Sequence, residues 1–181
     1  MKKEKISKLI DKAIFGLKSI SCIMKHDDVY FNLVPLRRDG DFVLAAIDRD
    51  FQIDGYVIFS IGDVRSAETK GMMYDSIMRS EKVLDSHTVP PVDMRSFVSI
   101  FGTFLENAIP VSMDTKYGFY IGNVIKVGSK KVKISHFDPE CRLSGMVKLP
   151  YDDIYMIYFG NRYTEIYSKY ANVHDDAKSE K

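Results

Sequence analysis

The sequence predicts an α+β protein, mainly β, that consists of two tandem small barrels with flanking helices. Three observations lead to this fold class: a repeat of β-rich segments, an apolar stripe of helical period near the N-terminus, and a composition with 45% hydrophobic and 28% charged residues. Such a composition is typical of a globular protein and excludes a collagen-like, mucin-like or largely disordered chain.

The repeat is found when the chain is aligned with itself. Residues 30–64 fall on residues 120–154 without a gap, and six of the 35 pairs are identical. Average residue usage would give about two identities. The identical pairs are Tyr30/Tyr120, Val34/Val124, Asp48/Asp138, Gly55/Gly145, Val57/Val147 and Asp63/Asp153. Apolar positions and turn residues also coincide, which favours a duplicated β unit.

Each copy has the pattern strand, turn, strand, acidic loop, strand and short strand, followed by a helix-like segment. Turn residues at 38–40 and 128–130 separate runs of β-branched and aromatic residues. A copy of about 60 residues cannot bury much core as a flat sheet. We therefore expect each copy to curl into a small barrel closed by helices.

The predicted segments follow from this repeat and from the helical stripe. Apolar residues at steps of three and four, from Ile6 to Ile20, indicate an amphipathic helix with a buried stripe. Pro90-Pro91 indicates a linker, because proline fits neither a helix interior nor a strand ladder. The segments are an N-terminal helix over 1–24, a first repeat with a trailing helix over 25–84, a linker and helix over 85–112, a second repeat with a C-terminal helix over 113–170, and a flexible tail over 171–181.

Two motifs, Gly122-x-Val124 and Gly145-x-Val147, lie within the run from Gly118 to Phe159. In this run a bent hairpin, a variable loop, a Gly-x-Val-x-Leu strand and a short closing strand follow a helix. The order resembles the Sm-like fold, an SH3-like small β-barrel, over about a third of the chain. The resemblance implies the barrel fold. The residues by which that family holds RNA do not carry over, because residues 128–132 replace its Asp-x-x-Met-Asn and Leu149-Pro150 replaces its Arg-Gly pair.

Strand side chains alternate between two faces, so the repeat gives each copy an outer face. In the first copy this face is expected to carry Val43, Tyr56 and Ile58. Leaving large apolar side chains in water would forgo about 1.5 to 3 kcal/mol each, so we expect something to cover them. The leading hypothesis is a non-enzymatic binding or assembly module that meets an unidentified protein partner at these residues.

The outer face of the second copy is expected to be hydrated and basic. Aromatic residues Tyr117, Phe119 and Tyr120 lie near its lysines in the sequence, and those lysines are Lys116, Lys126, Lys130, Lys131, Lys133 and Lys148. Lysines attract backbone phosphates, and exposed rings stack on unpaired bases. The first alternative is therefore binding of RNA or single-stranded DNA. A purely solubilising role for a Lys-rich sheet edge is the simpler explanation of the same residues.

No catalytic signature, cofactor motif or metal-binding spacing is found in the sequence. Asp48 and Asp138 open acidic loops, where turn formation explains the carboxylates better than a bound cation does. His136 is expected on an inward face as a hydrogen-bonded core histidine. The second alternative is an enzyme with its site between the repeats, in a pocket that would hold His136, Asp153 or Cys141.

Cysteine usage and charge lead to expectations about the location and the partners of the protein. Cys22 and Cys141 lie far apart without the spacing of a zinc site, which favours a reducing, cytoplasmic location. Charged residues interrupt the N-terminal apolar run, so we expect no signal peptide, no membrane span and no membrane partner. The net charge of +1 gives no global attraction to nucleic acid. Formation of a homo-oligomer is compatible with the sequence.

Overall fold

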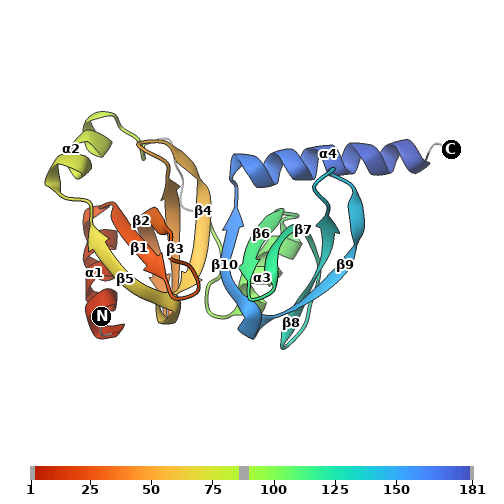
Figure 1. The fold of residues 1–181 in the computed structure, drawn as a ribbon, viewed down its shortest axis with the longest axis horizontal. Helices are drawn as coiled ribbons and strands as arrows, with labels where there is room; N and C mark the ends of the chain where they lie inside the picture. Colours follow the sequence, from red (N-terminus) through yellow and green to blue (C-terminus); the bar gives the residue numbers. More distant parts are fainter. Residues whose placement is uncertain (1–2, 86–89, 180–181) are drawn as a thin grey trace. The chain divides into compact units, whose positions relative to one another are not determined.

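The computed structural model describes residues 3–85 and 90–179, so residues 86–89 of the predicted linker lie outside the described part. The chain divides into two compact units, Met1–Pro91 and Val92–Lys181. Each unit is built on antiparallel strands, and helices flank them (Figure 1). The predicted α+β, mainly β fold class is confirmed.

Unit 1 begins with helix α1 (Lys3–Gly16) and ends with helix α2 (Met72–Ser80). Between the helices lie strands β1 (Ile20–Met24), β2 (Tyr30–Asp39), β3 (Phe42–Asp48), β4 (Ile53–Ser60) and β5 (Val64–Thr69). A turn of 3-10 helix, η1 (Ile61–Asp63), joins β4 to β5. The strand order is β5-β1-β2-β3-β4, and each neighbouring pair is antiparallel.

Unit 2 begins with helix α3 (Phe97–Glu106) and ends with helix α4 (Arg162–Ser179). Its strands are β6 (Val111–Thr115), β7 (Gly118–Val127), β8 (Lys131–Phe137), β9 (Leu143–Pro150) and β10 (Ile154–Phe159). The 3-10 turn η2 (Tyr151–Asp153) joins β9 to β10. The strand order is β10-β6-β7-β8-β9, again antiparallel throughout.

The two units match element by element. In chain order their strands have 5, 10, 7, 8 and 6 residues in unit 1 and the same lengths in unit 2. A 3-10 turn of 3 residues precedes the last strand in both. Each unit therefore has five strands, one more than the sequence pattern indicated.

The additional strands are β1 and β6, and their alternation explains why they form. Ile20, Cys22 and Met24 of β1 are buried while the residues between them are half-buried, a period of two rather than 3.6. Helix α1 ends at Gly16, so the predicted helix over 1–24 is too long. At the other terminus α4 continues through the expected tail to Ser179, because no Gly or Pro follows Gly160 to end it.

The turn η2 closes the sheet of unit 2. The amide of Lys116 donates to the carbonyl of Asp153 at 2.9 Å, and the amide of Tyr151 donates to the carbonyl of Lys130 at 3.1 Å. These bonds fasten the turns at both ends of β7 to η2. A strand of 10 residues extends about 33 Å, whereas a 3-residue 3-10 turn rises only about 6 Å. Strand β7 must therefore curve strongly.

Unit 1 is closed by the same two bonds. The amide of Lys25 donates to the carbonyl of Asp63 at 2.7 Å, and the amide of Ile61 donates to the carbonyl of Asp41 at 2.8 Å. Here too the turns at both ends of the second strand, β2, meet the 3-10 turn. The curvature is thus a property of both units.

Helices close the cores of the curved sheets. In unit 1 the helix α1 buries Ile6, Ile10 and Ala13, while in unit 2 the helix α3 buries Phe101 and Phe104. Apolar side chains spaced three and four apart form one stripe of a helix, which is the face that the sheet covers. The helices therefore supply the core that short strands lack.

Gly122 marks the closest approach of two strands in unit 2. It pairs with Val111 on β6 and with His136 on β8. A Cβ atom added to Gly122 would lie 1.9 Å from the backbone oxygen of Ser135 and 2.8 Å from its carbonyl carbon. Because both atoms belong to the backbone, no side-chain rotation can make room. Only glycine fits this curved position of β7.

Replacing Gly122 with Ala is therefore expected to destabilise the protein by about 3 kcal/mol or more, since the sheet must shift to accept the methyl group. Urea unfolding followed by circular dichroism measures the change. Gly102→Ala in α3 is the matched control, because a Cβ there meets nothing within 4 Å. This control should stabilise the helix by about 0.5 to 1 kcal/mol. Equal stability of the two variants would contradict the close approach.

Candidate functional site

Three lysines form a row across neighbouring strands of unit 2. Lys126 on β7 pairs directly with Lys133 on β8, and Lys133 pairs directly with Lys148 on β9. Directly opposed residues of antiparallel strands point to the same side, with Cβ atoms about 5 Å apart. We call Lys126, Lys133 and Lys148 the lysine row.

The lysine row faces solvent without a compensating carboxylate. Lys126 and Lys148 are exposed and Lys133 is half-buried. Among the side chains that the structure describes, no carboxylate forms an ion pair with any of the three. Like charges directly opposite one another destabilise a sheet. The row therefore costs the fold some stability and creates a local positive potential that the net charge of +1 conceals.

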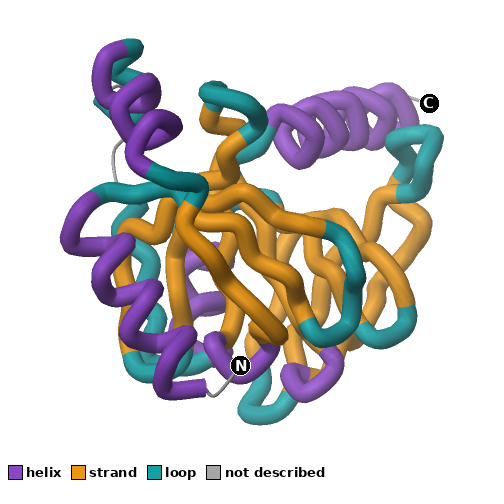
Figure 2. Tube along the Cα trace, turned by 60° about the vertical axis from the view of Figure 1, so that its left-hand side comes forward, coloured by secondary structure: helices purple, strands orange, loops and turns teal. Residues whose placement is uncertain are grey.

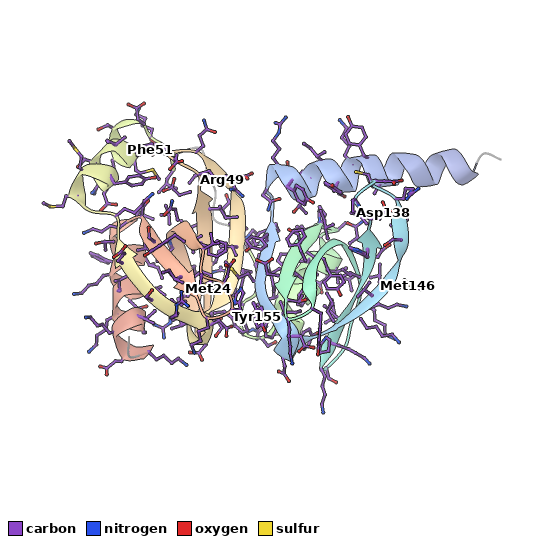
Figure 3. All side chains as sticks on the ribbon, in the orientation of Figure 1. Met24, Arg49, Phe51, Asp138, Met146 and Tyr155 are labelled. Carbon is purple, nitrogen blue, oxygen red and sulfur yellow. The ribbon has the colours of Figure 1, made fainter. Side chains whose placement is uncertain are left out.

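Apolar side chains lie beside the lysine row on the same face. Met146 is 65% exposed and pairs with Ser135, two residues along β8 from Lys133. Figure 3 shows Met146 on the outer side of β9. Val132 and Ile134, which alternate with Lys133, are buried. The predicted division into a buried apolar face and an outward basic face is therefore present in β8, whereas β9 buries Leu149 alone and leaves Leu143 37% exposed.

The turns that flank β7 bring further lysines to the same end of unit 2. Lys130 and Lys131 are exposed in and after the β7–β8 turn, and Lys116 is exposed in the β6–β7 turn. Both turns are fastened to η2 by the bonds described above. The hydroxyl of Tyr151 also donates to the carbonyl of Gly128 at 2.7 Å, and burial raises the pKa of this hydroxyl. All six lysines predicted from the sequence thus lie on the lysine row or on these two turns.

The aromatic residues near these lysines separate into two kinds. Tyr117 is 68% exposed, and the Nζ atom of Lys116 lies 5.5 Å from its ring centroid. Phe119 instead contacts the ring of Tyr163 on α4 with centroids 6.0 Å apart. Tyr120 packs edge-to-face against His136 at 5.4 Å. Tyr117 is therefore the ring of this group with the greatest area open to a ligand.

The structure corrects the apolar face predicted for unit 1. Val43 pairs with Phe59, and Leu44 pairs with Ile58, while Tyr56 lies two residues before Ile58 on β4. Because paired residues share a face, Val43 points to the opposite side from Tyr56 and Ile58. Val43 and Ile58 are buried and Tyr56 is half-buried. The three candidates do not form one exposed surface.

The ungapped alignment explains this error. Four residues (49–52) separate β3 from β4, whereas five (138–142) separate β8 from β9. Strand β3 is therefore shifted by one position relative to the ungapped alignment, whereas β4 is not. Val43 takes the place of the buried Val132, and Leu44 takes the place of Lys133. A shift of one residue moves every side chain of a strand to the other face.

The row of unit 1 that matches the lysine row has a different chemistry. Arg37 pairs with Leu44, and Leu44 pairs with Ile58. Leu44 and Ile58 are both buried. Two apolar side chains thus stand where unit 2 has Lys133 and Lys148, so the two units differ most clearly at this row.

Part of the outer face of unit 1 is covered by α2. Val34, Ala46 and Met78 form a buried cluster, and Tyr56 and Tyr74 pack against it. Val34 and Ala46 pair across β2 and β3, while Met78 belongs to α2. At these positions the face is therefore covered by the trailing helix α2 of the same unit, and not by the N-terminal helix that was expected to cover it.

The acidic loop of unit 1 anchors this helix. One oxygen of Asp48, Oδ2, accepts a bond from the hydroxyl of Tyr74 at 2.7 Å and one from the hydroxyl of Ser19 at 3.3 Å. The other, Oδ1, accepts from the amide of Phe51 at 3.1 Å, and the ring of Phe51 stacks on Tyr74 beside α2 (Figure 3). Burial, together with the bond to Asp48, raises the pKa of Tyr74. Asp48 therefore forms a turn and holds a helix.

The acidic loop of unit 2 is a self-contained turn. Asp138 Oδ1 accepts bonds from the amides of Glu140 at 2.8 Å and Arg142 at 2.9 Å, and Oδ2 accepts from Arg142 Nε at 3.0 Å. The bond from the Arg142 amide is the main cause that lowers the pKa of Asp138. Within residues 3–85 and 90–179, no group of three or more His, Cys, Asp or Glu side chains could hold a metal ion.

The candidates for an enzymatic site occupy different parts of unit 2. His136 is half-buried, and its Nδ1 lies 3.0 Å from the carbonyl oxygen of Ile121, so the expected hydrogen bond is present. Cys141 belongs to the loop before β9, whereas Asp153 belongs to η2 after β9. Cys141 and Asp153 thus lie at opposite ends of that strand.

Replacing Lys148 with Glu is expected to stabilise the protein by about 0.2 to 1 kcal/mol at low salt, because an opposite charge would then face Lys133. Urea unfolding at low and high NaCl measures the effect, which should shrink as salt screens it. The control Lys131→Glu faces Pro150 across the ladder and should stabilise less. A loss of stability in Lys148→Glu would show that the lysine row is not repulsive.

Comparisons with known proteins add no relative to this description. No family model matches the sequence, and no curated protein is similar to it. Within the described part of the chain, no helix combines the length and the hydropathy needed to cross a bilayer. The function of the chain must therefore be inferred from the geometry of its own residues.

Proposed function

We propose that this chain is a non-enzymatic binding protein made of two Sm-like small barrels, and that unit 2 binds single-stranded nucleic acid through the lysine row. The tandem arrangement is supported by the equal strand lengths, the equal strand order and the equal bonds to the 3-10 turns in both units. The barrel shape is supported by the strong curvature of β2 and β7.

The observation that carries the binding proposal is the lysine row itself. The backbone positions of the three lysines span about 10 Å, given a strand spacing of about 4.8 Å. A fold that only needed solubility would place lysines beside carboxylates rather than opposite one another. Phosphate groups of a nucleic acid would relieve the repulsion, and released counterions would favour the complex.

Tyr117 favours a single strand over a duplex. An exposed tyrosine ring stacks on an unpaired base, which a duplex does not offer. Tyr117 lies beside Lys116 on a turn that η2 holds at the same end of the unit as Lys130. The combination of fixed cations and an exposed ring is the usual basis of sequence-tolerant single-strand binding.

Protein contact remains the competing function, but it needs another surface. The burial of Val43 and Ile58 leaves little apolar area for a partner at the residues first considered. A cytoplasmic location fits both proposals, because Cys22 and Cys141 are free thiols. Salt separates the two functions, since phosphate contacts weaken steeply with salt and apolar contacts hardly respond.

Fluorescence anisotropy with a labelled single-stranded RNA of mixed sequence, with the matching DNA strand and with its duplex, tests the proposal. We expect tighter binding of either single strand than of the duplex, and an affinity that falls as salt rises. Replacing Lys126, Lys133 and Lys148 with Gln should flatten the logarithmic salt dependence by about 0.7 for each lysine removed.

The control variant Lys5→Gln, Lys8→Gln, Lys12→Gln removes the same charge from α1. It should leave affinity and salt dependence unchanged. Absence of binding by the unaltered protein, or an equal loss in both triple variants, would overturn the proposal.

A further inference from the structure

Unit 1 presents large apolar side chains that protrude into solvent at two neighbouring places. Phe15 is 96% exposed and Leu17 is 53% exposed at the end of α1. Met72 is 86% exposed and Met73 is 77% exposed at the start of α2. We call these four residues the apolar tips. Large apolar side chains grouped in this way usually mark a site of interaction.

The local structure fixes Phe15 and Leu17 in this position. The buried stripe of α1 ends at Ala13, and Phe15 lies on a different side of the helix. The amide of Lys18 then donates to the carbonyl of Ala13 at 3.0 Å, which ends the helix with Leu17 at a φ of 46°. This left-handed conformation favours glycine. A half-exposed leucine thus occupies a backbone conformation that glycine adopts more readily.

The two places belong to one surface. A groove beside Phe15 and Leu17 is lined on its other side by Met78, Arg79, Leu84 and Asp85. The amide of Ser19 also donates to Oδ1 of Asp75 in the first turn of α2 at 3.1 Å, so the end of α1 adjoins α2. Both Figure 1 and Figure 2 show the C-terminal end of α1 next to α2. The side of α2 that carries Met78 also packs on the sheet, while Met72 and Met73 point away from it.

The charge around the apolar tips is positive. A second hollow lies beside Phe15, and Lys12 and Lys18 line it. The other basic residues near the tips are Lys70, Arg79 and Lys82, against the exposed carboxylates Glu68, Glu81 and Asp85. Asp11, which also lines the hollow, is held in an ion pair with Arg38 at 2.9 Å. Cations therefore outnumber the unpaired acids in the surroundings of the tips.

We propose that unit 1 binds the surface of an anionic lipid bilayer, with the apolar tips inserted among the acyl chains and the surrounding cations on the headgroups. A bilayer suits this surface because protruding side chains enter a fluid layer without needing matched pockets, and basic residues beside them attract anionic lipids. A protein partner would instead need a pocket for each tip. This site is separate from the lysine row.

The expectation of no membrane partner rests on two features, the lack of a spanning segment and the apolar stripe of α1. That stripe is buried by the sheet. The apolar tips lie outside it, and two of them come from α2, which no residue pattern places beside the end of α1. Association of the apolar tips with a membrane surface therefore requires neither a spanning segment nor the apolar stripe of α1.

The absence of tryptophan from the whole sequence makes a direct test available. Phe15→Trp introduces a single tryptophan at a tip, and Met146→Trp introduces one at an exposed methionine of unit 2. Vesicles of two parts phosphatidylcholine to one part phosphatidylglycerol should shift the emission of Phe15→Trp to shorter wavelength and leave Met146→Trp unchanged. Vesicles of phosphatidylcholine alone should cause a much smaller shift.

Vesicle sedimentation of the otherwise unaltered chain separates the two basic surfaces. The variant Phe15→Ser, Met72→Ser, Met73→Ser should bind mixed vesicles at least about tenfold more weakly, because it removes most of the inserted area without touching the core. The variant Lys133→Gln, Lys148→Gln should bind them as the unaltered chain does.

The proposal is overturned if the unaltered chain fails to bind mixed vesicles, in which case the apolar tips would serve a protein partner. It is also overturned if binding is lost in the variant of the lysine row and kept in the variant of the tips. An emission shift of equal size for both tryptophans would likewise contradict insertion at Phe15. Nucleic-acid binding can succeed or fail independently of each result.

Discussion

Closure of a strongly curved sheet onto one turn of 3-10 helix is the constraint on which both units depend. Each turn accepts and donates one backbone bond, and the two bonds fix the turns that begin and end the longest strand. Backbone groups carry these bonds, so the closure tolerates different side chains. The choice of side chain is restricted where the curvature brings two strands closest. Position 122 of β7 is glycine because the carbonyl of Ser135 occupies the space that a Cβ atom would need.

This framework carries opposite chemistry at the same row in the two units. Leu44 and Ile58 contribute to stability by burial, at about 25 cal/mol for each Å² removed from water. Lys133 and Lys148 at the matching places oppose folding by mutual repulsion. The cost is small beside the burial of the core, which is why unit 2 can keep a charged face. The same arrangement of strands therefore carries a buried apolar row in one unit and a charged row that faces solvent in the other.

The sequence predicted some parts of this structure well because the local pattern decided them. The first residues of β8 alternate lysine with apolar residues, so the face that carries these lysines could be assigned from period alone. The acidic loops and the hydrogen-bonded His136 were also predicted correctly. The pairing of Lys126 with Lys133 needed the register of β7, which depends on a bulge between Val124 and Lys126 that no residue pattern marks.

Other parts could not be predicted, either because the same residues fit both a helix and a strand or because the alignment of the two units needs a gap. Ile20 extends the helical stripe of α1 and also begins the alternation of β1, and the stripe was given preference. Val43 was placed on the wrong face because one additional loop residue in unit 2 shifts the hairpin. The apolar tips depend on tertiary contact between α1 and α2, which a sequence of this kind does not encode in a local motif.

The carboxylate of Asp48 has a consequence for how unit 1 opens. It joins the start of β1 through Ser19, the β3–β4 loop through Phe51 and the helix α2 through Tyr74. Because a single buried carboxylate accepts bonds from three segments, detachment of any one of them leaves this carboxylate with fewer partners and weakens the point at which the other two are held. These segments, distant in the chain, should accordingly exchange their amide hydrogens as one cooperative element rather than fray separately.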